Sequence, residues 1–96
     1  MFTHIAMFRI RPDVEEAEIE AVRARLLELP GLVPDVKTFS VGRDARISEG
    51  NWDMVVVAGF EDEAGYKAYA AHPDHQPVIM EVRQIISERA GIQFED

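Results

Sequence analysis

The chain has 96 residues, which is the length of one domain with a modest hydrophobic core. Its formal net charge of −8 gives a surface that repels phosphate backbones and anionic lipids, so we expect neither a nucleic-acid partner nor a membrane partner. It has no cysteine, which excludes disulfides, thiolate metal sites and thiol nucleophiles.

The beginning of the sequence predicts a strand followed by a helix. Residues 2–10, FTHIAMFRI, are rich in strand-forming side chains and are apolar on both faces. Pro12 ends this strand, and Asp13 with Glu16 resembles a helix-capping pair. Apolar residues then recur at steps of three and four, which predicts a helix over 13–29.

The middle of the chain predicts two strands and two further helices. Prolines and a glycine at 30–34 predict a loop, and strands are predicted at 36–42 and 52–60. A helix over 62–71, capped by the aspartate that begins it, follows. Pro73 suits the first turn of the next helix, whose apolar stripe is Val78, Ile79, Val82, Ile85 and Ile86.

A last strand at 88–95 completes an α+β pattern. The order is βαββαβ, the ferredoxin-like arrangement, which predicts a four-stranded antiparallel sheet with helices on one face. Because helices cover only one face, apolar strand side chains need a second cover, and we predict a homodimer with facing sheets. The side chains on which this prediction rests are Phe2, Phe8, Trp52, Met54 and Val56.

The segment YAAHPDHQP, residues 69–77, concentrates the side chains that can carry chemistry. It holds two of the three histidines of the chain, His72 and His75, together with Tyr69 and Asp74. In a metal site, His72, Asp74 and His75 would converge on one ion at about 2–2.2 Å. No second cluster of ligands lies nearby in the sequence, so we predict no metal.

Two other interpretations of this segment remain open. In an acid–base site, His75 would act as the base, because histidine titrates near neutrality, and Tyr69 would donate a hydrogen bond to a developing enolate. His4 lies on the even-numbered face of the first strand and would share their cavity if that face lines it. Alternatively the segment is structural, because Pro73 and Asp74 are ordinary residues at the start of a helix.

Three segments together carry a resemblance to a known family. They are HIAMFRIRPDVEEAEIE near the start, LPGLVPDVKTFSVGRD at 29–44, and FEDEAGYKAYAAHPDHQPVIMEV at 60–82, where a tyrosine precedes His-Pro-x-His. In this order and spacing they resemble the stress-responsive dimeric A/B barrel family, often called Dabb. The resemblance spans nearly the whole chain and implies a ferredoxin-like protomer whose dimer closes an α/β barrel between two sheets.

The same resemblance implies a set of site residues. One branch of the family contains plant polyketide cyclases, which close a linear poly-β-keto chain by aldol chemistry. The tyrosine and histidine that serve as acid and base in that branch match Tyr69 and His75, and a histidine near the start of the first strand matches His4. Met54 stands where the cyclases have a further pocket histidine.

These observations predict a dimer that binds a hydrophobic carbonyl compound and performs aldol- or cyclase-like acid–base chemistry without a cofactor. The alternative is a non-catalytic, stress-responsive binding or interaction protein. A haem-degrading monooxygenase on the same type of barrel is a third interpretation, which rests on fold analogy alone. The opening MFTHIAMFRIRPD lacks the pattern of a signal peptide, so a cytoplasmic location is expected.

Overall fold

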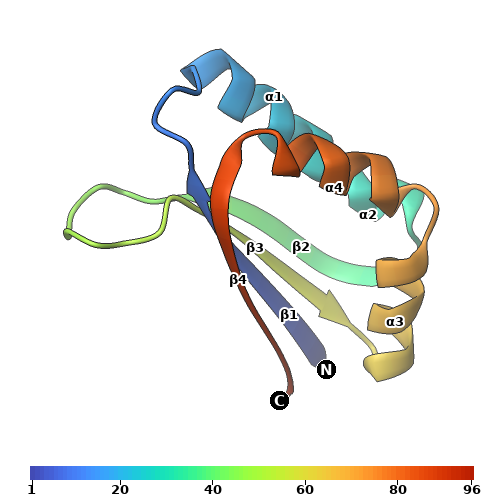
Figure 1. Ribbon diagram of the computed structural model, residues 1–96. Coiled ribbons are helices and arrows are strands. Elements are labelled where there is room, and N and C mark those ends of the chain that lie inside the picture. The colour runs from blue at the N-terminus through green and yellow to red at the C-terminus, as the bar shows by residue number, and fades with distance from the viewer.

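Four antiparallel strands form the sheet of the protein, which a computed structural model describes over residues 1–96. The strands are β1 (Phe2–Ile10), β2 (Val36–Arg43), β3 (Met54–Phe60) and β4 (Ile86–Glu95). Their order in the sheet is β2-β3-β1-β4, which places the first strand in the interior and brings the two chain termini side by side (Figure 1). The predicted ferredoxin-like arrangement is confirmed.

The helices all lie on one face of this sheet (Figure 1). They are α1 (Glu16–Leu26), α2 (Leu29–Leu32), α3 (Glu63–Ala71) and α4 (His75–Arg83). None of them is long and apolar enough to cross a membrane. The loop between β2 and β3 projects beyond the end of the sheet, away from α3.

The start of α1 differs from the sequence prediction. The helix begins after Glu15, whose side chain makes no capping hydrogen bond. Asp13, the predicted cap, instead lies 3.6 Å from the guanidinium group of Arg11. Part of the expected loop after this helix forms the short helix α2, because Pro30 occupies its first turn, where a missing N–H leaves no hydrogen bond unmade.

The predicted cap of α3 is confirmed, whereas α4 begins two residues later than expected. Asp62 accepts a hydrogen bond from a backbone N–H in the first turn of α3, at 2.9 Å. Pro73 lies in a turn before α4 rather than in its first turn. In that turn the backbone N–H of Asp74 donates to His72 Nδ1 at 3.1 Å, and His75 becomes the first helical residue.

The hydrophobic core lies between the helices and the inward face of the sheet. Even-numbered residues of β1 and β3 supply this face, with Phe8 opposite Met54 in the register. Phe8, Met54 and Val56 are therefore buried under the helices. The prediction of a dimer counted these three side chains, together with Phe2, among those needing a second cover. It was wrong about all four, because Phe2 also packs against this core and because a strand that is apolar on both faces does not show which face the helices cover.

The opposite face of the sheet is also apolar, and no helix covers it. Ile5 of β1 stands opposite both Val57 of β3 and Ile92 of β4, so apolar side chains form a continuous row across three strands. Ile92 remains 57% exposed and Phe94 38% exposed. We call this surface the outer apolar face, and its members are Ile5, Met7, Val55, Val57, Ile92 and Phe94.

Candidate functional site

A cavity of about 320 Å³ lies between the inward face of the sheet and helices α3 and α4. Most of its wall is apolar, from side chains such as Phe8 and Val56. The three side chains predicted to form a catalytic site, His4, Tyr69 and His75, all line it. The structure thus brings together residues that are far apart in the sequence, while their catalytic role stays a prediction.

Three elements bring these rings together. His4 comes from the middle of the sheet, Tyr69 from the last turns of α3, and His75 from the first residue of α4. The ring centre of Tyr69 lies 4.2 Å from that of His75 and 6.4 Å from that of His4. Tyr66, which the sequence analysis missed, lies 4.9 Å from His4 by ring centres. Its spacing of three residues from Tyr69 on a helix was the signal that both rings share one face.

His4 is a buried and neutral histidine in this site. Only 6% of the residue is exposed, and burial, followed by the charges of Arg89 and His75, lowers its pKa to about 4. Its Nδ1 lies 2.9 Å from Nε2 of Gln93, an amide nitrogen that donates, so Nδ1 accepts. The neutral ring therefore carries its proton on Nε2.

His75 has the opposite tautomer. Its Nδ1 lies 3.4 Å from the carbonyl oxygen of Ala70, which can only accept, so Nδ1 carries the proton and Nε2 keeps a lone pair. Burial lowers the pKa of His75; the hydrogen bond to Ala70 opposes this shift, and the charge of His72 adds to it. At neutral pH the ring is therefore unprotonated at Nε2 and chemically able to accept a proton.

Tyr69 keeps its hydroxyl proton in the cavity. The residue is only 3% exposed, and burial raises its pKa to about 12, with a further rise caused by Tyr66. No group of the chain forms a hydrogen bond with this hydroxyl. Every side-chain oxygen that is fully buried in this protein has a hydrogen-bond partner, so the Tyr69 oxygen is not fully buried and opens onto the cavity that the residue lines. It is available to donate to a bound molecule.

The possible metal ligands of the segment at 69–77 do not converge. His72 is turned toward Asp74, with Nδ1 3.8 Å from a carboxylate oxygen, whereas His75 faces the cavity. No group of three or more His, Asp or Glu side chains in the chain is arranged to hold a metal ion. The set of His72, Asp74 and His75 is therefore not assembled as a metal site.

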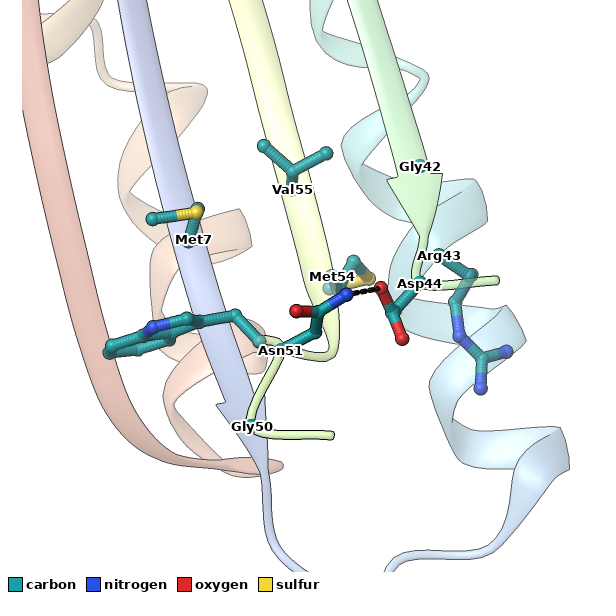
Figure 2. Close-up of a pocket in the computed structure, with 9 residues that line it drawn as sticks. Met7, Gly42, Arg43, Asp44, Gly50, Asn51, Met54 and Val55 are labelled. Atoms are coloured by element: carbon teal, nitrogen blue, oxygen red, sulfur yellow. Dashed lines mark hydrogen bonds between the residues drawn. The ribbon is translucent and has the colours of Figure 1, made fainter. Parts of the chain in front are cut away.

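A second cavity, of about 440 Å³, lies on the other side of the sheet beside the loop that joins β2 and β3. Figure 2 shows Met7 and Val55 of the outer apolar face at its wall, and a hydrogen bond from the Asn51 amide to Asp44 at its edge, 3.1 Å long. Trp52 also lines it, with the guanidinium carbon of Arg9, outside the lining, 4.4 Å from the ring centre. The wall holds no histidine or tyrosine, so it lacks the combination of side chains found in the first cavity.

Comparisons with known proteins agree with this architecture. The family model of the stress responsive A/B barrel domain, Dabb, matches residues 2–96. No curated protein matches the chain. A crystal structure described as a dimeric ferredoxin-like protein of unknown function, from Thermobifida fusca, is 34% identical with a TM-score of 0.89, and the match covers 97% of this chain and 88% of that one.

Two enzymes are among the similar structures. The hydroxynitrile lyase of Passiflora edulis has a TM-score of 0.87 at 14% identity, and the match covers 97% of this chain and 90% of the lyase. SnoaB of Streptomyces nogalater, a cofactor-independent oxygenase, has a TM-score of 0.79 at 19% identity, with 99% of this chain and 91% of SnoaB covered. At these identities the likeness establishes a shared fold.

Proposed function

The chain belongs to the stress responsive A/B barrel (Dabb) family, and from this premise we propose that it is an enzyme that moves protons on a small hydrophobic carbonyl compound. The observation that carries the proposal is that His4 and His75 share one cavity while their Nδ1 atoms face different partners, an amide nitrogen and a carbonyl oxygen, which assign opposite tautomers to the two rings. His75 offers a lone pair and His4 offers an N–H, both from neutral rings. Tyr69, whose ring lies near both histidine rings, adds a hydroxyl that keeps its proton.

The proposed reaction begins with proton abstraction beside a carbonyl group. Nε2 of His75 takes the proton, and the electrons of the broken C–H bond move to the carbonyl oxygen, giving an enolate and a protonated imidazole. The His4 Nε2–H and the Tyr69 hydroxyl donate to the enolate oxygen, where a largely apolar wall strengthens both hydrogen bonds. The enolate carbon then attacks a second carbonyl carbon, and the oxygen of that carbonyl takes the electrons of its broken pi bond and the proton held on His75. Alternatively the enolate carbon takes the proton back from His75.

The relatives support a catalytic use of this fold without fixing its chemistry. A hydroxynitrile lyase and a cofactor-independent oxygenase both have the same architecture. The proposed reaction needs no cofactor, and in this it is like the reaction of the cofactor-independent oxygenase. The alternative, a non-catalytic binding protein of the same family, uses the same cavity and differs only in whether a bound molecule is converted.

We also propose that the working unit is a homodimer with its sheets face to face. The outer apolar face supports this, because a row of apolar side chains across three strands is left without a cover in the single chain. The relative from Thermobifida fusca, itself described as dimeric, adds support. Trp52, half-buried at the edge of this face, would then contact the second copy.

The cytoplasmic location predicted from the sequence is likewise a proposal. A composition free of cysteine is compatible with a reducing compartment. Fractionation of the cells that make the protein, followed by immunoblotting, is expected to find it with cytoplasmic markers. Recovery with exported proteins would contradict this location.

Deuterium exchange of a ketone tests the proposed reaction directly. Phenylacetone and its 4-carboxy derivative are incubated with the protein in D₂O at neutral pH, and loss of the protons beside the carbonyl is followed by NMR. We expect the wild type to accelerate exchange in at least one of them, and His75→Ala to lower that rate by about 100-fold. His72→Ala is the matched control, because this histidine belongs to the same segment but does not line the cavity.

The control variant decides how a loss of rate is interpreted. Retained exchange in His72→Ala, with loss in His75→Ala, would support the role given to His75. If the wild-type protein accelerates deuterium exchange in neither ketone, the result would contradict the proposed enzymatic activity and favour the alternative of a non-catalytic binding protein.

A further inference from the structure

Two arginines at the cavity have no carboxylate partner in the chain. Arg83 of α4 and Arg89 of β4 both line the cavity and are exposed at its opening. Acidic residues outnumber basic ones by 18 to 10, so carboxylates are abundant. All the other arginines form an ion pair with a carboxylate: Arg9, Arg11, Arg23, Arg25, Arg43 and Arg46. Both arginines without a carboxylate partner therefore lie at the cavity.

Arg89 is directed along its strand toward the catalytic groups. It stands opposite Phe8 on the inward face of the sheet, and Gly91, the next inward residue, stands opposite Ala6 on the way to His4. The guanidinium group of Arg89 lies over Gly91, and a Cβ added at Gly91 would lie 2.9 Å from its Nη1. The absence of a side chain at Gly91 therefore leaves the space that the guanidinium group occupies.

The charge of Arg89 reaches the proposed active site. It contributes to the lowered pKa of His4 and opposes the raised pKa of Tyr69, so the guanidinium group lies within electrostatic range of both. Arg83 adds a second positive charge to the same wall. Two like charges beside an apolar cavity repel each other, and an anion bound between the opening and the rings relieves that repulsion.

We propose that Arg83 and Arg89 bind a carboxylate of the substrate, which makes the substrate a hydrophobic keto acid. The keto group of this substrate rests on the proposed function, whereas its carboxylate is inferred from the two arginines. The guanidinium group matches a carboxylate because its N–H donors form two parallel hydrogen bonds with the two oxygens. The carboxylate then lies at the opening, the apolar part fills the cavity, and the carbonyl group reaches His4, Tyr69 and His75.

Two ligands of the same shape and different charge test this carboxylate site. The probes are 2-naphthoate and 2-naphthamide, and their affinities are measured by titration calorimetry at neutral pH and low salt. We expect the wild type to bind 2-naphthoate at least about tenfold more tightly than 2-naphthamide. Arg89→Gln is expected to weaken 2-naphthoate about tenfold and to leave 2-naphthamide unchanged, with a smaller loss in Arg89→Lys and a parallel loss in Arg83→Gln.

Lys37→Gln is the matched control for a general loss of positive charge. Lys37 also lacks a carboxylate partner, but it is exposed on β2 and does not line the cavity. Its substitution should change neither affinity. Equal affinity for the two probes, no binding of 2-naphthoate, or the same loss in Lys37→Gln would overturn the proposal.

Binding and catalysis fail separately in this design. His75→Ala removes the proposed base and should retain the preference for 2-naphthoate. Exchange of ketone protons without a preference for 2-naphthoate would support the proposed enzyme and contradict the carboxylate site. A preference for 2-naphthoate without exchange would support the carboxylate site and contradict the proposed enzyme.

Discussion

The two faces of one sheet differ in what their apolar surfaces contain. On the inward face, β1 contributes His4 to a cavity that also holds Tyr69 and His75. On the outward face, the next residue, Ile5, lies in a row of apolar side chains, and the cavity on that side holds no histidine or tyrosine. Because successive side chains of a strand point to opposite faces of the sheet, these two neighbouring residues belong to different surfaces, one suited to chemistry and the other to assembly.

The outer apolar face should be the more sensitive of the two to an added charge. Ile5→Glu places a carboxylate at the centre of the proposed dimer contact, where burying it costs several kcal/mol, so we expect monomers. Light scattering coupled to size-exclusion chromatography measures the mass. Ala17→Glu adds the same charge on the exposed surface of α1 and should remain dimeric; a dimeric Ile5→Glu would contradict the facing-sheet contact.

On the inward face, His4 should make stability depend on pH. Its folded-state pKa of about 4 lies below the unfolded value of 6.5, so between these values the unfolded chain binds more protons than the folded one. Stability from this source is complete above pH 6.5 and falls as the pH approaches 4, by up to about 3 kcal/mol. Urea unfolding across this range measures it, and His4→Gln should show a correspondingly smaller fall. Parallel curves for the two proteins would refute the buried neutral histidine.

The tyrosines separate catalysis from packing on the inward face. Tyr69→Phe removes the hydroxyl that opens onto the cavity, and we expect ketone exchange to slow about tenfold because one donor to the enolate is lost. Tyr66→Phe is the comparison, since Tyr66 is a neighbouring ring of the same helix with no assigned proton transfer. Equal rates in the two variants would remove Tyr69 from the reaction.

The smallest expected effect comes from Gly91. Gly91→Ala puts a methyl group against the guanidinium group of Arg89, and the flexible end of that side chain must move aside. We expect about threefold weaker binding of 2-naphthoate and unchanged binding of 2-naphthamide, because the charge is displaced rather than removed. The same calorimetric titration measures it, and an equal change for both ligands would point to a general distortion of the cavity.

The sequence was sufficient to predict the fold and three of the cavity residues. The order of strands and helices led to the ferredoxin-like sheet, and the resemblance singled out His4, Tyr69 and His75, which share the cavity. The sequence could not assign the apolar side chains of β3 to a face, because both faces of that strand are apolar. For that reason Met54 was predicted to need a second cover, whereas it is buried under the helices. Asp13 failed as a cap because α1 begins after Glu15, two residues further along the chain, and Asp13 lies beside Arg11 instead.

The unpaired arginines could not be predicted from the sequence. Whether Arg83 or Arg89 finds a carboxylate depends on neighbours that only the folded chain brings close. Glu88 precedes Arg89 in the sequence, yet it pairs with Arg9 on the opposite face, because successive strand residues point to opposite sides. The charge balance of the cavity is therefore a property of the tertiary structure.

The histidine tautomers test the central claim most directly. Long-range ¹⁵N–¹H correlation spectra of the ¹⁵N-labelled protein at neutral pH report which ring nitrogen of each histidine carries the proton. We predict two neutral rings with opposite tautomers, His4 protonated on Nε2 and His75 protonated on Nδ1. A charged ring at either position, or the same tautomer in both, would contradict the pairing of a donor with a base on which the proposed chemistry depends.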